Sequence, residues 1–235
     1  MSPLRWSYLG RVEYDAAREL QSRLAATRAA RGCDDLLLLL EHPPVLTLGR
    51  HATAPPTAPW PVVRTDRGGD VTYHGPGQLV GYPVVALRSA GRGVRAFVAA
   101  LEAAMCDVAA ACGVEAYARA GLPGVWSGSP ARKLGAIGLA VHRGVTLHGC
   151  ALNVDARAER GFDGVDPCGM RGVAVTSLTA EGAPADVTPE SIAPLLAERL
   201  AYRLGLEACR ADDAHAILPT SFITAATSHG HRSAS

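Results

Sequence analysis

The chain has 235 residues, of which 48% are hydrophobic and 19% charged, and its formal net charge is +1 at pH 7. These values indicate a globular protein able to bury a sizeable core, and they exclude the strongly basic character of most nucleic-acid-binding domains. The longest strongly apolar run, residues 36–40, is far shorter than the roughly 20 residues of a membrane-spanning helix. Because the N-terminus also lacks the apolar segment of a signal peptide, we expect a cytoplasmic protein.

The first predicted element is a helix over residues 14–32, where apolar residues recur at helical spacing and a glycine ends the pattern. Residues 35–50 then predict a buried strand, a break enforced by two prolines and a second strand. Residues 51–60 have the composition of a loop. Apolar alternation on either side of a Gly-Pro-Gly turn predicts a β-hairpin over residues 71–86.

A second long helix is predicted over residues 93–113, again ended by a glycine. Residues 133–154 predict two strands joined by a turn at residues 142–144. The last predicted helix covers residues 188–205, with a threonine N-cap and a proline in its first turn.

Strands and helices alternate irregularly, which favours a mixed α/β or α+β fold over a strict βαβ repeat. We therefore expect one α/β domain with a mixed sheet over residues 1–212. Residues 213–235 lack periodicity and predict a flexible tail.

Residues 67–84, RGGDVTYHGPGQLVGYPV, combine polar side chains with several glycines. A hairpin would explain the backbone, but not why Arg67, His74 and Gln78 surround these glycines. Glycine lets a ligand approach the backbone closely and leaves N–H groups available as donors. This stretch therefore predicts a loop that binds a polarised carbonyl or an anion.

Cys168 lies between Pro167 and Gly169, a context that predicts an exposed turn rather than a buried element. A thiol on such a turn can ionise and attack an electrophile if a cation or base lies nearby. The simpler interpretation is a turn cysteine without a chemical role. None of the six cysteines has the C-x2-C spacing of a zinc site, so we expect no metal.

Lys133 is the only lysine among 23 basic residues, since the other 22 are arginines. Arginine stays protonated, whereas a desolvated lysine can release its proton. One lysine could survive by chance, but the functional interpretation is an amine that stabilises a thiolate and then transfers a proton. Proximity to Cys168 is a hypothesis, because 35 positions separate the two residues.

The stretch VTLHGCALNV, residues 145–154, adds His148 as a supporting candidate. Strand alternation places Thr146, His148 and Cys150 on one face. A single strand histidine is more often structural than catalytic, and we expect Cys150 to be a packing residue on a site wall.

Seven stretches together resemble the octanoyl-[acyl carrier protein]:protein N-octanoyltransferase family, known as LipB. In chain order they are LTLGR (46–50), RGGDVTYHGPGQLVGYPV (67–84), PGVW (123–126), KLGAIGLAV (133–141), VTLHGCALNV (145–154), PCGM (167–170) and VTSL (175–178). The long glycine-rich motif together with PCG is highly specific for this family.

The resemblance implies the α/β catalytic fold shared with biotin protein ligases and lipoate ligases. It implies that Cys168 accepts an octanoyl group and that Lys133 lowers the pKa of this thiol and assists proton transfer. Further residues are implied to line the acyl pocket: Arg67, Gly68, Gly69, Asp70, Val71, Thr72, Tyr73, His74, Ala136, Ile137, Gly138, Gly149, Cys150 and Ala151. Supporting positions are His148, Gly75, Gly77 and Gln78.

Two positions depart from the family pattern. Cys150 replaces a residue that is commonly phenylalanine or another large apolar residue, and Met170 replaces a common isoleucine. Neither departure removes a catalytic group, but both bear on the preferred acyl-chain length.

The implied donor is octanoyl-acyl carrier protein, and the implied acceptors are lipoyl domains of 2-oxoacid dehydrogenase E2 subunits and the glycine cleavage H protein. Exchange between two thioesters is nearly balanced and amide formation is downhill, so we expect no cofactor, nucleotide or metal.

Three alternatives remain open at this point. The first is an ATP-dependent lipoate or biotin ligase, which shares the fold but needs no cysteine nucleophile. The second is a hydrolase in which His74 or His148 activates Cys168 towards water. The third is a metal-binding module, against which the spacing of cysteine and histidine residues argues.

Overall fold

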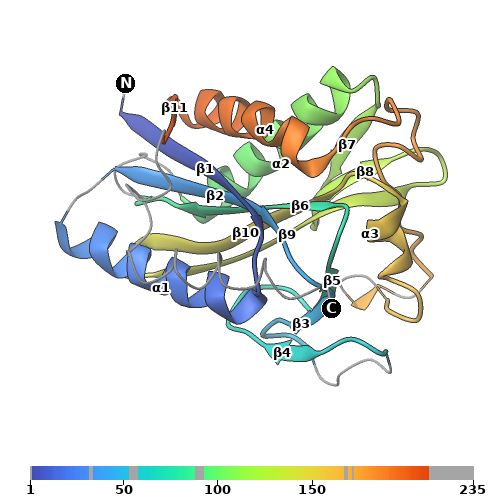
Figure 1. Ribbon diagram of the computed structural model, residues 1–235, viewed down its shortest axis with the longest axis horizontal. Helices are drawn as coiled ribbons and strands as arrows, with labels where there is room; N and C mark the ends of the chain where they lie inside the picture. Colours follow the sequence, from blue (N-terminus) through green and yellow to red (C-terminus); the bar gives the residue numbers. More distant parts are fainter. Residues whose placement is uncertain are drawn as a thin grey trace, which may run out of the picture.

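The computed structural model describes residues 2–31, 34–52, 58–87, 93–166, 169–170 and 172–211. Within these residues the chain forms a large mixed sheet, a small sheet and α-helices on both faces of the large sheet (Figure 1). The predicted mixed α/β architecture is therefore confirmed. The predicted tail lies outside the described residues.

The large sheet has eight strands in the order β11-β1-β2-β6-β10-β9-β8-β7. Its strands are β1 (Pro3–Arg11), β2 (Asp35–Glu41), β6 (Gln78–Val84), β7 (Ala116–Arg119), β8 (Leu122–Ser127), β9 (Arg132–His142), β10 (Val145–Asn153) and β11 (Glu207–Arg210). Strand β1 runs parallel to β2 and β11, and the other neighbours are antiparallel. The predicted buried strand at residue 35 and the pair of strands joined at residues 142–144 are both present.

The small sheet has three strands and lies beyond one end of α1 and the large sheet (Figure 1). Its central strand β3 (Val45–Leu48) pairs in parallel with β4 (Val62–Arg64) and antiparallel with β5 (Val71–His74). The proline break at residues 43–44 carries the chain from the large sheet into this small one.

Helix α1 (Tyr14–Arg31) covers one face of the large sheet, while α2 (Val94–Ala111) and α4 (Pro189–Leu204) cover the other (Figure 1). The short helix α3 (Ala156–Arg160) follows β10 near the small sheet. Among the described residues, none of these helices combines the length and the apolarity that crossing a membrane requires.

Helix α4 begins and ends where the sequence predicts. Thr188 accepts a hydrogen bond from the N–H of Ser191, and the Ser191 side chain accepts one from the N–H of Thr188, which completes a capping box. Gly205 adopts a left-handed φ of 70° at the C-terminus, a conformation that glycine reaches without steric cost.

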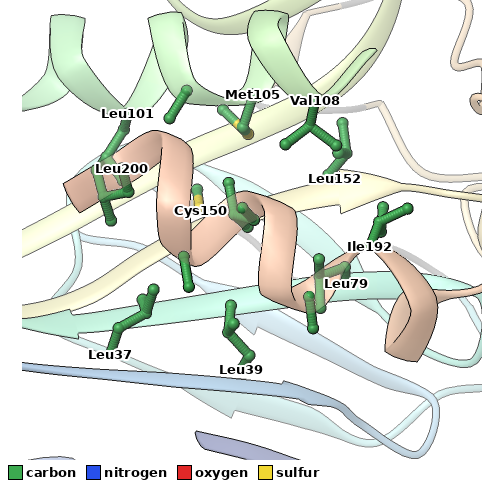
Figure 2. Packing of buried hydrophobic residues seen from close by; sticks show 14 of the residues in the cluster. Leu37, Leu39, Leu79, Leu101, Met105, Val108, Cys150, Leu152, Ile192 and Leu200 are labelled. Atoms are coloured by element: carbon green, nitrogen blue, oxygen red, sulfur yellow. The ribbon is translucent and has the colours of Figure 1, made fainter. Parts of the chain in front are cut away.

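The largest apolar core lies between the sheet and helices α2 and α4 (Figure 2). Buried side chains from both layers interdigitate there, including Leu37, Leu39, Leu79, Leu101, Met105, Val108, Cys150, Leu152, Ile192 and Leu200. A second cluster joins α1 to the opposite face of the sheet, and a third joins the small sheet to Trp60 and Phe162.

The predicted hairpin over residues 71–86 is wrong. Strand β5 pairs with β3 in the small sheet, whereas β6 pairs with β2 and β10 in the large sheet. The Gly-Pro-Gly turn is a corner between two sheets: the Gly77 N–H donates to Glu41 Oε2 at 2.7 Å, and its carbonyl accepts from Val154 N at 2.9 Å. Glycine and proline predict the turn, but not which strands pair on either side of it.

Candidate functional site

The single lysine is buried on β9. Lys133 exposes 3% of its surface, and its Nζ donates a hydrogen bond to the Pro123 carbonyl at 3.2 Å. The same Nζ lies 4.6 Å from the ring centroid of Trp126, the residue opposite it on β8. Within the described part of the chain these are its polar contacts, and neither is a carboxylate. An ammonium group has three protons, so donors remain for another partner.

The chain that follows Cys168 runs alongside this lysine. The Lys133 N–H donates to Ala174 O at 2.8 Å, and the Thr176 N–H donates to Lys133 O at 3.0 Å. Gly169 packs against Asp70, since a Cβ atom at this glycine would lie 2.6 Å from Asp70 Oδ2. Pro167 and Cys168 themselves lie outside the described residues.

Two adjacent spaces border this region. The lysine chamber, of about 10 Å³, is lined by Thr72, Gln78, Lys133, Gly135, Ala136, Asn153, Phe162 and Val175. The inner cavity, of about 30 Å³, is lined by Tyr14, Arg67, Thr72, His74, Tyr82, Ala136, Gly138, His148, Gly149, Cys150 and Ala151. Thr72 and Ala136 border both spaces, so the two spaces lie side by side, and together they are called the passage.

Arg67 fastens the glycine-rich loop between the two sheets. Its guanidinium donates to the carbonyl oxygens of Thr47 and Asp70, both at 2.7 Å, and also to Thr47 Oγ1. The Gly68 N–H donates to Leu139 O on β9 at 2.8 Å. A Cβ atom on Gly138 would lie 3.0 Å from Gly68 O, so glycine on β9 lets the loop pack directly onto the strand.

A buried chain of hydrogen bonds links this loop to the lysine chamber. His74 Nδ1 lies 2.7 Å from Gln78 Oε1, Gln78 Nε2 donates to Asn153 Oδ1 at 2.9 Å, and Asn153 Nδ2 donates to Thr176 O at 3.0 Å. Because Gln78 Oε1 can only accept, these partners assign the proton of His74 to Nδ1. The network ties β5, β6 and β10 to the segment beside Lys133.

Two histidines next to the inner cavity are held neutral. Burial, together with the nearby His42, lowers the pKa of His74 to about 3. Burial also lowers the pKa of His42 to about 4, against the opposing effect of its hydrogen bond to the Val12 carbonyl. The hydroxyl of Tyr82 faces His42 Nε2 at 2.8 Å and can donate to it. Neither ring is therefore a resident cation at neutral pH.

Thr72 brings an unpaired hydroxyl to the junction of the two spaces. Its Oγ1 is buried and has no hydrogen-bond partner among the described residues. A buried polar atom without a partner is uncommon in folded proteins because it loses its bonds to water without replacement. It is available to a ligand that carries a hydrogen-bonding atom.

Strand alternation predicts that His148 and Cys150 share one face of β10, but in the structure they do not. The backbone φ of His148 is +57°, and its Nε2 lies 2.8 Å from Oδ1 of Asp66, in the loop that follows β4. The register of β10 and β6 places it opposite Pro83, which has no N–H, and the His148 N–H is bonded instead to Gln21 Oε1 at 2.8 Å. The loss of one ladder bond allows this local turn.

Cys150 packs into the core on the α2 and α4 face (Figure 2), so its side chain points away from α1. The departure from the family pattern at this position therefore lies in the core rather than beside the loop. Burial raises the pKa of this thiol to about 12, which keeps it protonated and unreactive.

The remaining predicted positions divide into two groups. Gly68, Gly69, Asp70, Gly75 and Gly77 shape the loop and the corner without lining either space. Val71 and Tyr73 pack into the third cluster, and Ile137 packs against the main core.

Sequence reasoning missed Tyr14, Tyr82, Phe162 and Val175, which also line the passage. Tyr82 and Val175 lie within the stretches that resemble the family, whereas no local pattern marks Tyr14 or Phe162. Among the described residues, no cluster of histidine, cysteine and acidic side chains could hold a metal ion.

Comparison with known proteins gives concordant results. The lipoyl protein ligase A/B catalytic domain matches residues 13–201. The octanoyltransferase of Mycolicibacterium gilvum is 48% identical over 185 residues, which cover 76% of each chain.

Solved structures show the same fold at low sequence identity. The bipartite lipoate protein ligase of Thermoplasma acidophilum has a TM-score of 0.67 at 15% identity, covering 97% of this chain and 92% of that one. The biotin protein ligase of Aquifex aeolicus has a TM-score of 0.52 at 12% identity, covering 86% and 70%. The implied fold is thus confirmed, and the chain belongs to the lipoyl protein ligase A/B catalytic-domain family and, within it, to the octanoyltransferases, which are acyltransferases.

Proposed function

We propose that this protein transfers an octanoyl group from octanoyl-acyl carrier protein to a lysine of a lipoyl domain, through a thioester on Cys168. The observation that carries the proposal is the buried Lys133 amine at one end of a narrow passage, without a carboxylate partner among the described residues. The backbone of residues 174–176, only a few positions after Cys168, is bonded to Lys133 itself. Family membership supports octanoyl transfer rather than ATP-dependent ligation.

In the first step the Cys168 thiolate attacks the carbonyl carbon of the donor thioester. The new C–S bond forms at Cys168, the old C–S bond breaks, and the departing carrier thiolate takes a proton from the Lys133 ammonium. The products are the octanoyl-enzyme, the carrier thiol and a neutral Lys133. One thioester replaces another, so no energy source is required.

In the second step the neutral amine of the acceptor lysine attacks the octanoyl-enzyme. The amide bond forms, Cys168 leaves as a thiolate, and the proton lost by the acceptor nitrogen passes to Lys133. This restores the pair of thiolate and ammonium with which the cycle began. The acyl chain enters the passage formed by the lysine chamber and the inner cavity, whose side chains must move apart to admit it because the two spaces have volumes of about 10 and about 30 Å³. Thr72 Oγ1 lies where the two spaces meet, as a donor for the carbonyl oxygen.

The acceptors are lipoyl domains of the 2-oxoacid dehydrogenase E2 subunits and the glycine cleavage H protein, and the reaction takes place in the cytoplasm. The choice of lipoyl domains as acceptors is supported by the structural neighbour from Thermoplasma acidophilum, a bipartite lipoate protein ligase that belongs to a lipoylation system with an E2 lipoyl domain. The chemistry requires no cofactor.

The direct test of the proton-transfer role is Lys133→Arg, which keeps the positive charge but not the removable proton. We expect transfer from octanoyl-carrier protein to an apo lipoyl domain to fall by roughly 100-fold or more. Arg132→Lys is the matched control: it keeps the charge at the neighbouring position on β9, which is paired with Glu181, and should leave the rate unchanged. A Lys133→Arg enzyme of near wild-type rate would show that charge alone suffices.

A further inference from the structure

His148 separates the inner cavity from an open groove beside α1. This α1 groove, of about 500 Å³, is lined by Asp15, Arg18, Glu19, Gln21, Ser22, Asp66, His142, Leu147 and His148. Among the described residues, His148 alone borders both the groove and the inner cavity. His148 therefore lies between a small space and a much larger groove.

This wall is held from several directions. The ring bonds to Asp66 through Nε2, the backbone N–H bonds to Gln21 on α1, and only 5% of the side chain is exposed. The backbone of His148 is left-handed, a conformation that costs energy for any residue except glycine. A strained residue persists where its surroundings fix it, and such residues concentrate at functional sites.

The ring is influenced electrically from both sides. Burial lowers the pKa of His148, the hydrogen bond to Asp66 opposes this, and Arg67 in the inner cavity and His142 in the groove both lower it. His148 in turn contributes to the lowered pKa of His74, which lines the inner cavity. Arg67 lines the inner cavity and His142 lines the groove, so the ring has a basic neighbour in each space.

The spacing along the sheet matches an eight-carbon chain. Ala136, where the lysine chamber meets the inner cavity, pairs with Ala151, and His148 pairs with Leu139 three residues further along. Three residues of strand span roughly 10 Å. An extended octanoyl chain is of similar length, since each of its C–C bonds of ~1.5 Å advances it by somewhat less than that.

We propose that His148 is the end stop of the acyl passage and sets the longest chain that the enzyme accepts. This inference rests on the proposed function, because it requires the thioester to lie at the Lys133 end. An octanoyl chain ends against the imidazole, and a chain four carbons longer meets the wall formed by His148 and Asp66. Without the imidazole, the inner cavity opens into the α1 groove, which has room for the additional carbons.

The test compares carrier protein loaded with octanoyl or dodecanoyl groups on full-length wild type and on His148→Gly. Glycine adopts the left-handed backbone without strain. The readouts are the acyl-enzyme mass and the ratio of kcat/KM for the two donors. We expect wild type to prefer octanoyl strongly, and His148→Gly to raise the dodecanoyl-to-octanoyl ratio by roughly tenfold or more while still loading octanoyl.

Two further variants control this result. His142→Ala removes the other histidine at Asp66 and borders the groove only, so it should leave the ratio unchanged. Asp66→Asn keeps the imidazole but loses the charge that holds it, and should raise the ratio by a smaller factor. Since Asp66 is half exposed, this variant also keeps the inference testable if His148→Gly does not fold.

The outcomes separate the inference from the function on which it rests. Normal octanoyl loading with an unchanged ratio in both His148→Gly and Asp66→Asn overturns the end stop and leaves the proposed function standing. Loss of all loading in a folded His148→Gly also overturns it, because His148 would then be required for the reaction rather than for chain length. Absence of any octanoyl adduct on wild type contradicts the proposed function itself.

Discussion

The core of the large sheet and the place where the small sheet meets the large one, called the sheet junction, are built from different kinds of residue. On the α2 and α4 face of the large sheet, the buried side chains are almost entirely apolar and interdigitate as a conventional core (Figure 2). At the sheet junction, buried positions carry Arg67, His42, His74 and Thr72. Burying polar groups lowers stability unless they are satisfied, so their concentration at one place indicates a chemical role.

This difference separates the part of the molecule that stabilises the fold from the part that holds the candidate site. Each fully buried leucine on the α2 and α4 face contributes roughly 1.5–3 kcal/mol through the hydrophobic effect. The sheet junction instead holds histidines that are kept neutral, a hydroxyl without a partner among the described residues and a left-handed histidine. The apolar core of the large sheet therefore offsets the cost of the polar groups at the sheet junction.

The largest expected effect on stability is a loss of unfolding free energy at low pH, caused by the buried histidines at the sheet junction. The folded-state pKa values of His42 and His74 are lowered to about 4 and about 3, below the ~6.5 of an unfolded histidine. As the pH falls below ~6.5, the unfolded chain therefore binds protons that the folded chain does not bind, and stability is lost. Between pH 6.5 and 4 the free energy of unfolding should fall by about 2 to 3 kcal/mol per pH unit.

Urea unfolding at a series of pH values measures this slope. His42→Asn removes one of the two buried histidines and with it one of the two protons that only the unfolded chain binds. It should therefore reduce the slope of unfolding free energy against pH by about half, although it lowers the unfolding free energy at pH 7. His148, whose pKa burial also lowers, acts in the same direction in both proteins. If the free energy of unfolding stays constant between pH 7 and 5, the buried histidines are not held neutral. The contrast between the apolar core and the sheet junction would then be wrong.

A smaller effect distinguishes two threonines that pair across β3 and β5. Thr72 has a buried hydroxyl without a partner among the described residues, so Thr72→Val should raise the free energy of unfolding by about 1 kcal/mol. Thr47 Oγ1 accepts from Arg67 at 3.1 and 2.9 Å, so Thr47→Val should lower it by about 1–2 kcal/mol. Thermal unfolding of the two variants measures both shifts.

The two variants are informative because they are expected to change the free energy of unfolding in opposite directions. Thr72→Val should slow octanoyl transfer even while it stabilises the fold, because the hydroxyl lies where the acyl carbonyl is proposed to bind. Equal destabilisation by both substitutions would show that the Thr72 hydroxyl has a structural partner and that it does not await a ligand.

The sequence predicts local features well because short-range rules determine them. Caps and glycines mark the ends of α2 and α4, and the turn between β9 and β10 is where the pattern places it. Composition alone singles out Lys133 as a candidate, and the structure shows that this residue is buried, while its role stays a prediction.

Long-range pairing could not be predicted in the same way. The corner between β5 and β6 has the composition of a hairpin turn. It is not a hairpin because β5 pairs with β3 and β6 pairs with β2. The face of His148 depends on Pro83, which lies opposite it in space but 65 positions earlier in the chain. Tyr14 and Tyr82 join the inner cavity only because α1 and β6 are brought together by the fold.

The central claim is that Cys168 carries the acyl group between two proteins with Lys133 as its proton partner. Intact-mass analysis of the full-length enzyme after incubation with octanoyl-carrier protein tests it most directly. We expect one octanoyl adduct on Cys168, stable until an apo lipoyl domain is added and then transferred to that domain, and no adduct on Cys168→Ser. An adduct on Cys168→Ser, or octanoylation of the lipoyl domain at the wild-type rate by that variant, would contradict the account.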